Sequence, residues 1–264
     1  MSAISVPRGV LKAEWIKLRS VRSTYLIFGS AVVLALGIGL LDVWSIARNW
    51  ATMTAADRAS FDPVADSFSG FQFGELAFGA LGVLAISTEY GTGLIRTTLT
   101  AVPRRGTVFT AKALVLGTCA LVASELCAFV AFFLGQAVLS GPRLDVGITE
   151  HGVLRAVFSA GLYMAVVTMV GFGLGALIRH TAGAMAVMFG LVFLAWPAAR
   201  AVEGFSYLPD RWLLVNAAEA LVTTHPVTGP HAARIPSPGL AWLDLTLYLV
   251  VFLGLGAWRV SRDA

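Results

Sequence analysis

Six long apolar stretches constrain this chain more than any other feature. A helix needs about 20 apolar residues to cross the hydrocarbon core of a bilayer. Unpaired backbone groups are costly in lipid, so each stretch is expected to be helical. Only 13% of the residues are charged, against about 25% in soluble proteins. The chain is therefore predicted to be a single all-α membrane domain over residues 1–264. The six expected spans are roughly 24–44, 71–88, 108–139, 153–178, 183–199 and 239–258.

The distribution of charges predicts the orientation of these spans. An even number of spans puts both termini on the same side, and 12 of the 19 Lys and Arg residues fall on that side. Only 3 of the 15 acidic residues fall on that side. Cytoplasmic loops carry the excess of bases, so both termini are expected in the cytoplasm and the protein in the cell membrane. A cleaved signal peptide fits less well, because the first apolar run is long and no good cleavage site follows it.

The N-terminal segment, residues 1–23, is expected to form a basic amphipathic helix on the cytoplasmic membrane surface. Its apolar residues recur near helical spacing and its bases lie on other faces, a pattern typical of interfacial helices. Residues 24–258 would form the six-span bundle and 259–264 a cytoplasmic tail. The alternative is that the bases only set the topology. The candidate residues of this helix are Glu14, Trp15, Lys17, Arg19 and Arg22.

A short polar insert joins the second and third spans and cannot lie in hydrocarbon. Glu89 begins it, which favours a helix N-terminus there, because an acid is stabilised at that end of a helix. Gly91 and Gly93 permit a tight reversal, and Pro103 should end the following helix. A short helix with an apolar ridge suits docking into a groove of a partner. An ordinary capped loop is the alternative interpretation.

Three further features lie outside these two segments. Glu125 is a carboxylate in mid-span, which costs about 2.5–3.5 kcal/mol on insertion scales. It is a candidate for a translocation route, or for a structural hydrogen bond with Gln136 or Ser124. Residues 42–70 suggest a partly helical outer loop. Residues 211–222 predict a helix of about three turns, too short to span, which we expect to be re-entrant or interfacial on the outer side.

Several kinds of chemistry are excluded or disfavoured by the sequence. The chain has no Gly-x-x-x-x-Gly-Lys-Ser/Thr loop, so it cannot bind ATP by that motif. Its four histidines are scattered and none has metal-ligand spacing, so no metal site and no catalytic site is expected. The net charge of +4 is divided among several loops and does not indicate nucleic-acid binding. We therefore do not expect an enzyme.

Two motifs resemble a known family. One is Glu14-x-x-Lys17-Leu18-Arg19-Ser20-Val21-Arg22-Ser23 ahead of the first span. The other is Glu89-Tyr90-x-x-Gly93, leading to Thr98-Leu99, Pro103-Arg104-Arg105 and Lys112. Both resemble type-2 ATP-binding-cassette (ABC) permeases common in actinobacteria. The resemblance implies that the polar insert is a coupling helix resting in a groove of the ATPase subunit. The coupling residues would be Glu89, Tyr90, Gly93, Arg96, Thr98, Arg104 and Arg105. Many relatives read Glu-x-x-x-Gly-Thr-Leu, and this chain leaves Thr92 and Thr98 as alternatives for the threonine.

The resemblance also implies a function. The chain would be the permease subunit of an exporter, paired with a second copy or a similar permease and with ATPases that carry ATP and Mg²⁺. No cofactor is expected on this chain. A hydrophobic or amphipathic substrate would cross by alternating access. A membrane anchor or assembly factor, and an ion-coupled carrier using Glu125, are the other hypotheses.

Overall fold

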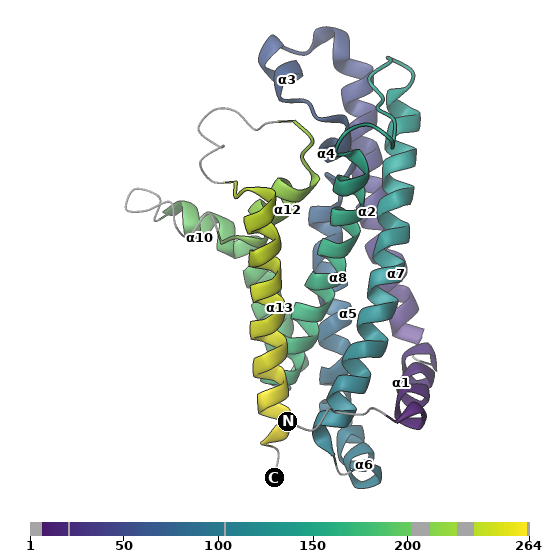
Figure 1. The fold of residues 1–264 in the computed structure, drawn as a ribbon, viewed down its shortest axis with the longest axis vertical. Helices are drawn as coiled ribbons and strands as arrows, with labels where there is room; N and C mark the ends of the chain where they lie inside the picture. The colour runs from purple at the N-terminus through teal and green to yellow at the C-terminus, as the bar shows by residue number, and fades with distance from the viewer. Residues whose placement is uncertain (1–6, 21, 103, 202–211, 226–234, 263–264) are drawn as a thin grey trace.

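The protein is an elongated bundle of helices (Figure 1). The computed structural model describes residues 7–20, 22–102, 104–201, 212–225 and 235–262, without the side chains at 22–24, 96, 99 and 101. Six helical segments in these ranges are long and apolar enough to cross a membrane, which confirms the predicted fold class. They are α2 (Arg22–Asn49), α5 (Phe71–Gly91), α7 (Arg105–Leu139), α8 (Val153–Ile178), the continuous α9 (Thr181–Phe189), η2 (Gly190–Leu194) and α10 (Ala195–Ala201), and α13 (Pro238–Ser261).

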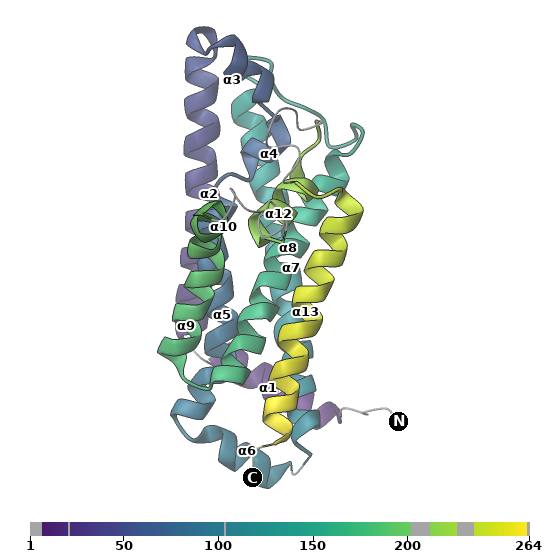
Figure 2. The same cartoon turned by 90° about the vertical axis from the view of Figure 1, so that its left-hand side faces the viewer.

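The shorter helices gather at the two ends of the bundle. Figures 1 and 2 place α1 (Arg8–Ser20) and α6 (Leu94–Ala101) at one end, together with the last turn of α13; we call this the α6 end. The opposite end, called the α3 end, carries η1 (Trp50–Thr52) and α3 (Ala55–Ser60). Two more short helices, α4 (Pro63–Ser67) and α12 (Leu214–Val222), lie between the spans toward the α3 end.

Helix α8 is the centre of the bundle and contacts α5, α7, α9, α12 and α13. Of the 18 consecutive residues that are most apolar in α8, 83% are buried, against 22% of the corresponding 18 residues in the first span. Glycines bring the backbones of α5 and α8 together. A Cβ added at Gly82 would lie 1.8 Å from Thr168 O, and one at Gly171 would lie 2.1 Å from Gly79 O. Close approach of this kind strengthens van der Waals packing between helices in lipid.

The fifth span differs from the single helix predicted over 183–199. Its middle is a π-helical turn, η2, and α10 then projects sideways from the bundle (Figure 1). Pro197 in α10 gives the physical reason, because proline has no N–H for the usual bond to residue 193 and its ring clashes with that carbonyl. The wider π turn just before the proline absorbs this misfit.

The α3 end is tied together by two buried polar residues. Asp62 caps α4 and also accepts a 2.6 Å hydrogen bond from the backbone N–H of Thr224, which follows α12. Gln136 of α7 donates to Pro63 O at 2.9 Å and accepts from the N–H of Val146 at 2.9 Å. Much of the predicted outer loop is therefore ordered: α2 continues to Asn49, and α4 packs against α2, α7 and α8.

The predicted helix over 211–222 is present as α12, which begins later, at Leu214. Residue 211 lies outside the described residues. The helix rests against α13 and α8, and Arg155 of α8 donates a 3.1 Å hydrogen bond to Leu221 O in its last turn. Its buried positions, among them Leu214 and Ala217, face those two spans. The apolar pattern thus serves packing against neighbouring helices.

Candidate functional site

Four charged side chains from three helices meet at the α6 end of the bundle. Glu14 and Lys17 come from α1, Glu89 from α5 and Lys112 from α7. Lys17 Nζ lies 2.8 Å from Glu14 Oε1 and 3.2 Å from Glu89 Oε1. Lys112 Nζ lies 2.5 Å from Glu14 Oε2 and 2.8 Å from Glu89 Oε1. Each lysine therefore bridges both carboxylates, and we call this set of four the charge cluster.

The charge cluster is buried. The side chains of Glu14, Glu89 and Lys112 are 2%, 8% and 9% exposed, and that of Lys17 is 28% exposed. Removing such charges from water is costly, and their attraction offsets the cost only when each one is well paired. The two acids and two bases balance, so the cluster carries no net charge while all four are ionised. Losing any one of them would leave an unbalanced charge in this site.

The helix ends make this pairing necessary. Glu89 lies in the last turn of α5, so the expectation that it starts a helix is wrong. The carbonyls at a helix C-terminus repel an acid, just as the N–H groups at an N-terminus repel a base. Lys112 lies two turns after the start of α7, beyond the first turn, so that helix end does little for its charge either way. Each of these two charges is therefore held by its partners and not by its own helix.

Lys17 has a more favourable place, in the last turn of α1. Burial alone would lower its pKa, but the hydrogen bond to Glu14 and the negative charge of Glu89 outweigh that effect and raise the pKa above its ordinary value of 10.5. Lys17 is therefore protonated at neutral pH. Glu14 and Lys17 can share the cluster because residues three apart lie on one face of a helix.

The charge cluster reaches α6 through one hydroxyl group. Lys17 Nζ donates a 3.2 Å hydrogen bond to Thr98 Oγ1 in the middle of α6, and this hydroxyl itself donates to Leu94 O at 3.0 Å. Thr92, the alternative threonine, bonds back to Thr88 O in α5. Of the two threonines, Thr98 is the one in contact with the cluster. A chain of contacts thus joins α6 to α1, α5 and α7.

Gly93 makes the turn that brings α6 into this position. Its φ is +74°, a left-handed conformation in which other L-residues are strained, and it is the N-cap residue of α6. The expected reversal is present, and it depends on Gly93, since Gly91 has ordinary helical geometry. In α6, Ile95 is buried and Leu94 is 45% exposed. The helix thus leaves one apolar side chain substantially exposed.

The other predicted coupling residues whose side chains are described are not members of the cluster. The ring of Tyr90 lies 5.2 Å from the guanidinium of Arg179, whose Nη2 donates to Arg259 O at the end of α13. Arg104 is exposed and precedes α7, and Arg105 is its first residue. Arg96 lies within α6, but its side chain falls outside the described residues.

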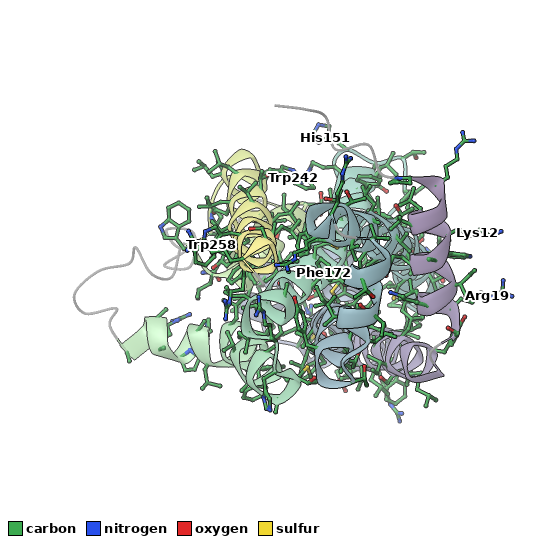
Figure 3. The ribbon with its side chains drawn as sticks, turned by 90° about the horizontal axis from the view of Figure 1, so that it is seen from below. Lys12, Arg19, His151, Phe172, Trp242 and Trp258 are labelled. Carbon is green, nitrogen blue, oxygen red and sulfur yellow. The ribbon has the colours of Figure 1, made fainter. Side chains whose placement is uncertain are left out.

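A helix, α1, lies where the interfacial helix was predicted and packs mainly against α7; residues 1–6 of the predicted segment lie outside the described residues. Trp15 on α1 is 49% exposed. In the view from below, Lys12 and Arg19 project from α1 away from the bundle (Figure 3). Arg22 begins α2, and its side chain is outside the described residues. The face of α1 toward the bundle supplies Glu14 and Lys17, while other positions present cations and an aromatic ring to the surroundings.

Lys112 is the cluster residue that sequence reasoning left out of its candidate site. The available signal was one lysine two turns into a long apolar helix, where an unpaired charge is unfavourable. Glu75 is a second such residue, since the charge count of the sequence leaves it among the acids that do not fall on the side of the termini. It lies inside the bundle, 3% exposed, and accepts a hydrogen bond from the Tyr163 hydroxyl of α8.

Glu125 lies against α8 and far along α7 from the charge cluster. A Cβ added at Gly161 would come within 2.6 Å of the Glu125 carboxyl carbon. Both carboxylate oxygens are buried and have no hydrogen-bond partner among the described residues. The suggested bonds to Gln136 and Ser124 are absent there, because Gln136 bonds to Pro63 O and the Ser124 hydroxyl to Leu121 O.

A cavity of about 400 Å³ adjoins the charge cluster. All four charged residues line it, together with apolar side chains of α1, α2, α5, α6 and α7. Apolar walls keep the local dielectric low, which strengthens the ion pairs. No group of three or more His, Cys, Asp or Glu suited to a metal occurs in the described part of the chain. What the described residues of this site provide is a set of paired charges that links α1, α5 and α7 and contacts α6.

Comparison with known proteins places these features in one family. A family model described as "ABC-2 family transporter protein" matches residues 10–195. The matched region includes the charge cluster, α6 and the first four spans. No curated protein matches the chain significantly.

Proposed function

Because the chain belongs to the ABC-2 family of transporter proteins, we propose that it is the permease subunit of an ABC exporter driven by a separate ATPase. Family membership implies an ATPase partner in general terms. The finer points are ours: a hydrophobic or amphipathic substrate, export, and alternating access between two permease subunits. ATP and Mg²⁺ would be bound by the ATPase, since this sequence has no P-loop.

One observation carries the proposal: the charge cluster connects the exposed helix α6 to α1, α5 and α7. Leu94 is 45% exposed on α6 and offers an apolar contact, and the Thr98 hydroxyl accepts a hydrogen bond from Lys17. A force applied to α6 would therefore act on the cluster and, through it, on three helices. In this mechanism the ATPase moves α6, and the paired charges make the attached helices move with it.

The orientation follows from the same end of the molecule. We place the α6 end in the cytoplasm, where the ATPase and its ATP would be found. The excess of Lys and Arg among the segments assigned to this side supports the placement. Both termini would then be cytoplasmic, and the α3 end, tied by Asp62 and Gln136, would face outward.

Glu125 has a looser place in the proposal, as a residue near the translocation route. An intramembrane carboxylate without a partner is costly, and such residues often serve transport. Glu125→Gln keeps the shape of the side chain and removes its charge. Unchanged transport at unchanged expression would show that the charge is dispensable. Transport that survives ATP depletion but stops when the proton gradient collapses would favour an ion-coupled carrier.

Copurification tests the proposed docking surface. Leu94→Asp places a charge on the exposed apolar residue of α6 and should weaken ATPase binding by about tenfold or more, as expected for a contact at the centre of an interface. Ala56→Asp is the matched control, because Ala56 is exposed on α3 at the other end. Equal ATPase recovery with both variants would contradict docking at α6. An anchor that recruits a protein without transport would bind the ATPase but leave its rate of hydrolysis unchanged.

A further inference from the structure

A lateral apolar groove runs between α2 and α7 and begins at α1. Two overlapping cavities of about 360 and 550 Å³ form it. We call it the α2–α7 groove. It begins beside Leu18 and Leu116, passes Trp15 and ends beside Val130. From residue 116 to 130 along α7 the distance is about 21 Å at 1.5 Å per residue. The residues shared by both cavities are Trp15, Phe28, Cys119 and Ala123.

The interior of the groove suits a hydrocarbon chain. Its walls are mostly apolar side chains, with the thiols of Cys119 and Cys127 and the hydroxyl of Thr118 among them. The hydroxyl of Thr168, which also lines it, already donates to Met164 O at 3.0 Å. A polar occupant would lose its hydrogen bonds to water and find few replacements here, which is costly. An alkyl chain loses nothing in the same place.

The mouth of the groove is positively charged. Arg19 lines the mouth, and Lys12 lines an adjoining hollow that shares Trp15 and Cys119 with the groove. Both basic side chains project outward from α1 (Figure 3). The nearby charge cluster is balanced, so Lys12 and Arg19 are not offset by it. Tryptophan and basic residues together are typical of the level of lipid headgroups.

We propose that the α2–α7 groove binds one acyl chain of an anionic glycerophospholipid, with its phosphate beside Arg19 and Lys12. The lipid comes from the leaflet at the α6 end. One leaflet of hydrocarbon is about 15 Å deep, half of a core of about 30 Å. A groove of about 21 Å that starts at α1 therefore accommodates one acyl chain. The bound lipid would fill the space under Trp15 and press α1 against α7, next to the charge cluster.

The groove cannot enclose a helix of a second subunit. A helix with its side chains is about 10 Å across, so a 21 Å length occupies about 1,600 Å³. The larger cavity holds only about 550 Å³. The groove can therefore enclose a single chain of methylene groups but not a whole helix.

Native mass spectrometry of the full chain in detergent tests the site. The probes are 1-palmitoyl-2-oleoyl phosphatidylglycerol and the corresponding phosphatidylcholine, added separately. Each cation near an anionic lipid raises the binding affinity by a factor of about five. Lys12 and Arg19 together should therefore give phosphatidylglycerol a preference of roughly 30-fold over phosphatidylcholine. Arg19→Gln should reduce it to roughly fivefold. Arg19 is exposed, so this variant should fold normally.

Filling the groove provides the second arm of the test. Ala123→Trp should abolish the retained phosphatidylglycerol, whereas Val250→Trp, at an exposed position on α13, should keep it. Equal retention of the two lipids by the wild-type protein would overturn the proposal. So would equal retention by the two tryptophan variants. A change of oligomeric state in Ala123→Trp without a change in bound lipid would mark the groove as a protein interface and would also overturn it.

Discussion

Lys112→Met should be among the most destabilising single substitutions at the α6 end. Lys112 is 9% exposed and lies 2.5 Å from Glu14 and 2.8 Å from Glu89. Without it, two buried carboxylates share only Lys17, and the cluster acquires a net negative charge. Removing one partner of a buried ion pair costs about 3–5 kcal/mol, because the other charge stays buried and unpaired. Lys12→Met is the matched control, since Lys12 is exposed and should cost less than about 0.5 kcal/mol.

A double-mutant cycle separates this explanation from a simple packing effect. Adding Glu89→Gln to Lys112→Met restores a neutral site, with Glu14 and Lys17 still paired at 2.8 Å. The double variant should therefore be more stable than the sum of the two single changes predicts, by about 1–3 kcal/mol. The assay is unfolding in mixed micelles titrated with SDS, followed by near-ultraviolet circular dichroism. Strictly additive losses would refute the idea that the four charges act as one unit.

Three further predictions test the turn, the core and the pH dependence. Gly93→Ala should cost about 1–2 kcal/mol because φ is +74° there, while Gly91→Ala, with ordinary φ and open space, should not destabilise in the same SDS titration. Gly82→Ala should severely lower the melting temperature, since its Cβ would lie 1.8 Å from Thr168 O, whereas Gly37→Ala meets nothing within 4 Å and should be neutral. Burial, then the charges of Asp42 and Asp62, raises the pKa of Asp66 from 3.8 to about 6. Because the folded pKa is raised, the wild-type protein should lose stability as pH rises from about 4 to about 6. Melting curves of Asp66→Asn should therefore run increasingly above those of the wild type over this range and converge with them below pH 4; parallel curves would contradict the assignment.

The number, type and approximate limits of the six spans could be predicted because they depend on local composition. The fourth span was predicted with the limits that α8 has. The polar insert was also expected to contain a short helix, and α6 is that helix. The end of α5 was misread, because a polar run with Glu89 in it fits the end of one helix as well as the start of the next.

The charge cluster could be predicted only in part because it depends on long-range packing. Glu14, Lys17 and Glu89 were separate candidates in two motifs, but nothing in their spacing indicates that 75 residues of chain return Glu89 to Glu14. Lys112 gains its role from the way α7 packs beside α1 and α5, which no local pattern encodes. The same holds for Glu75, whose partner Tyr163 is on a different span.

The Thr98 hydroxyl gives the most direct test of coupling between α6 and the charge cluster. Thr97 and Thr98 both donate to Leu94 O, at 2.8 and 3.0 Å, and only Thr98 is seen to accept a bond from Lys17 among the described contacts. Thr98→Val removes that bond, and Thr97→Val is its matched control. The measurement is the ATP hydrolysis rate of the copurified permease–ATPase complex in liposomes, relative to the ATPase alone. We predict that Thr98→Val still binds the ATPase but loses much of the permease-dependent change in rate, while Thr97→Val behaves as the wild type. Identical rates for Thr98→Val, Thr97→Val and the wild type would contradict coupling through the charge cluster.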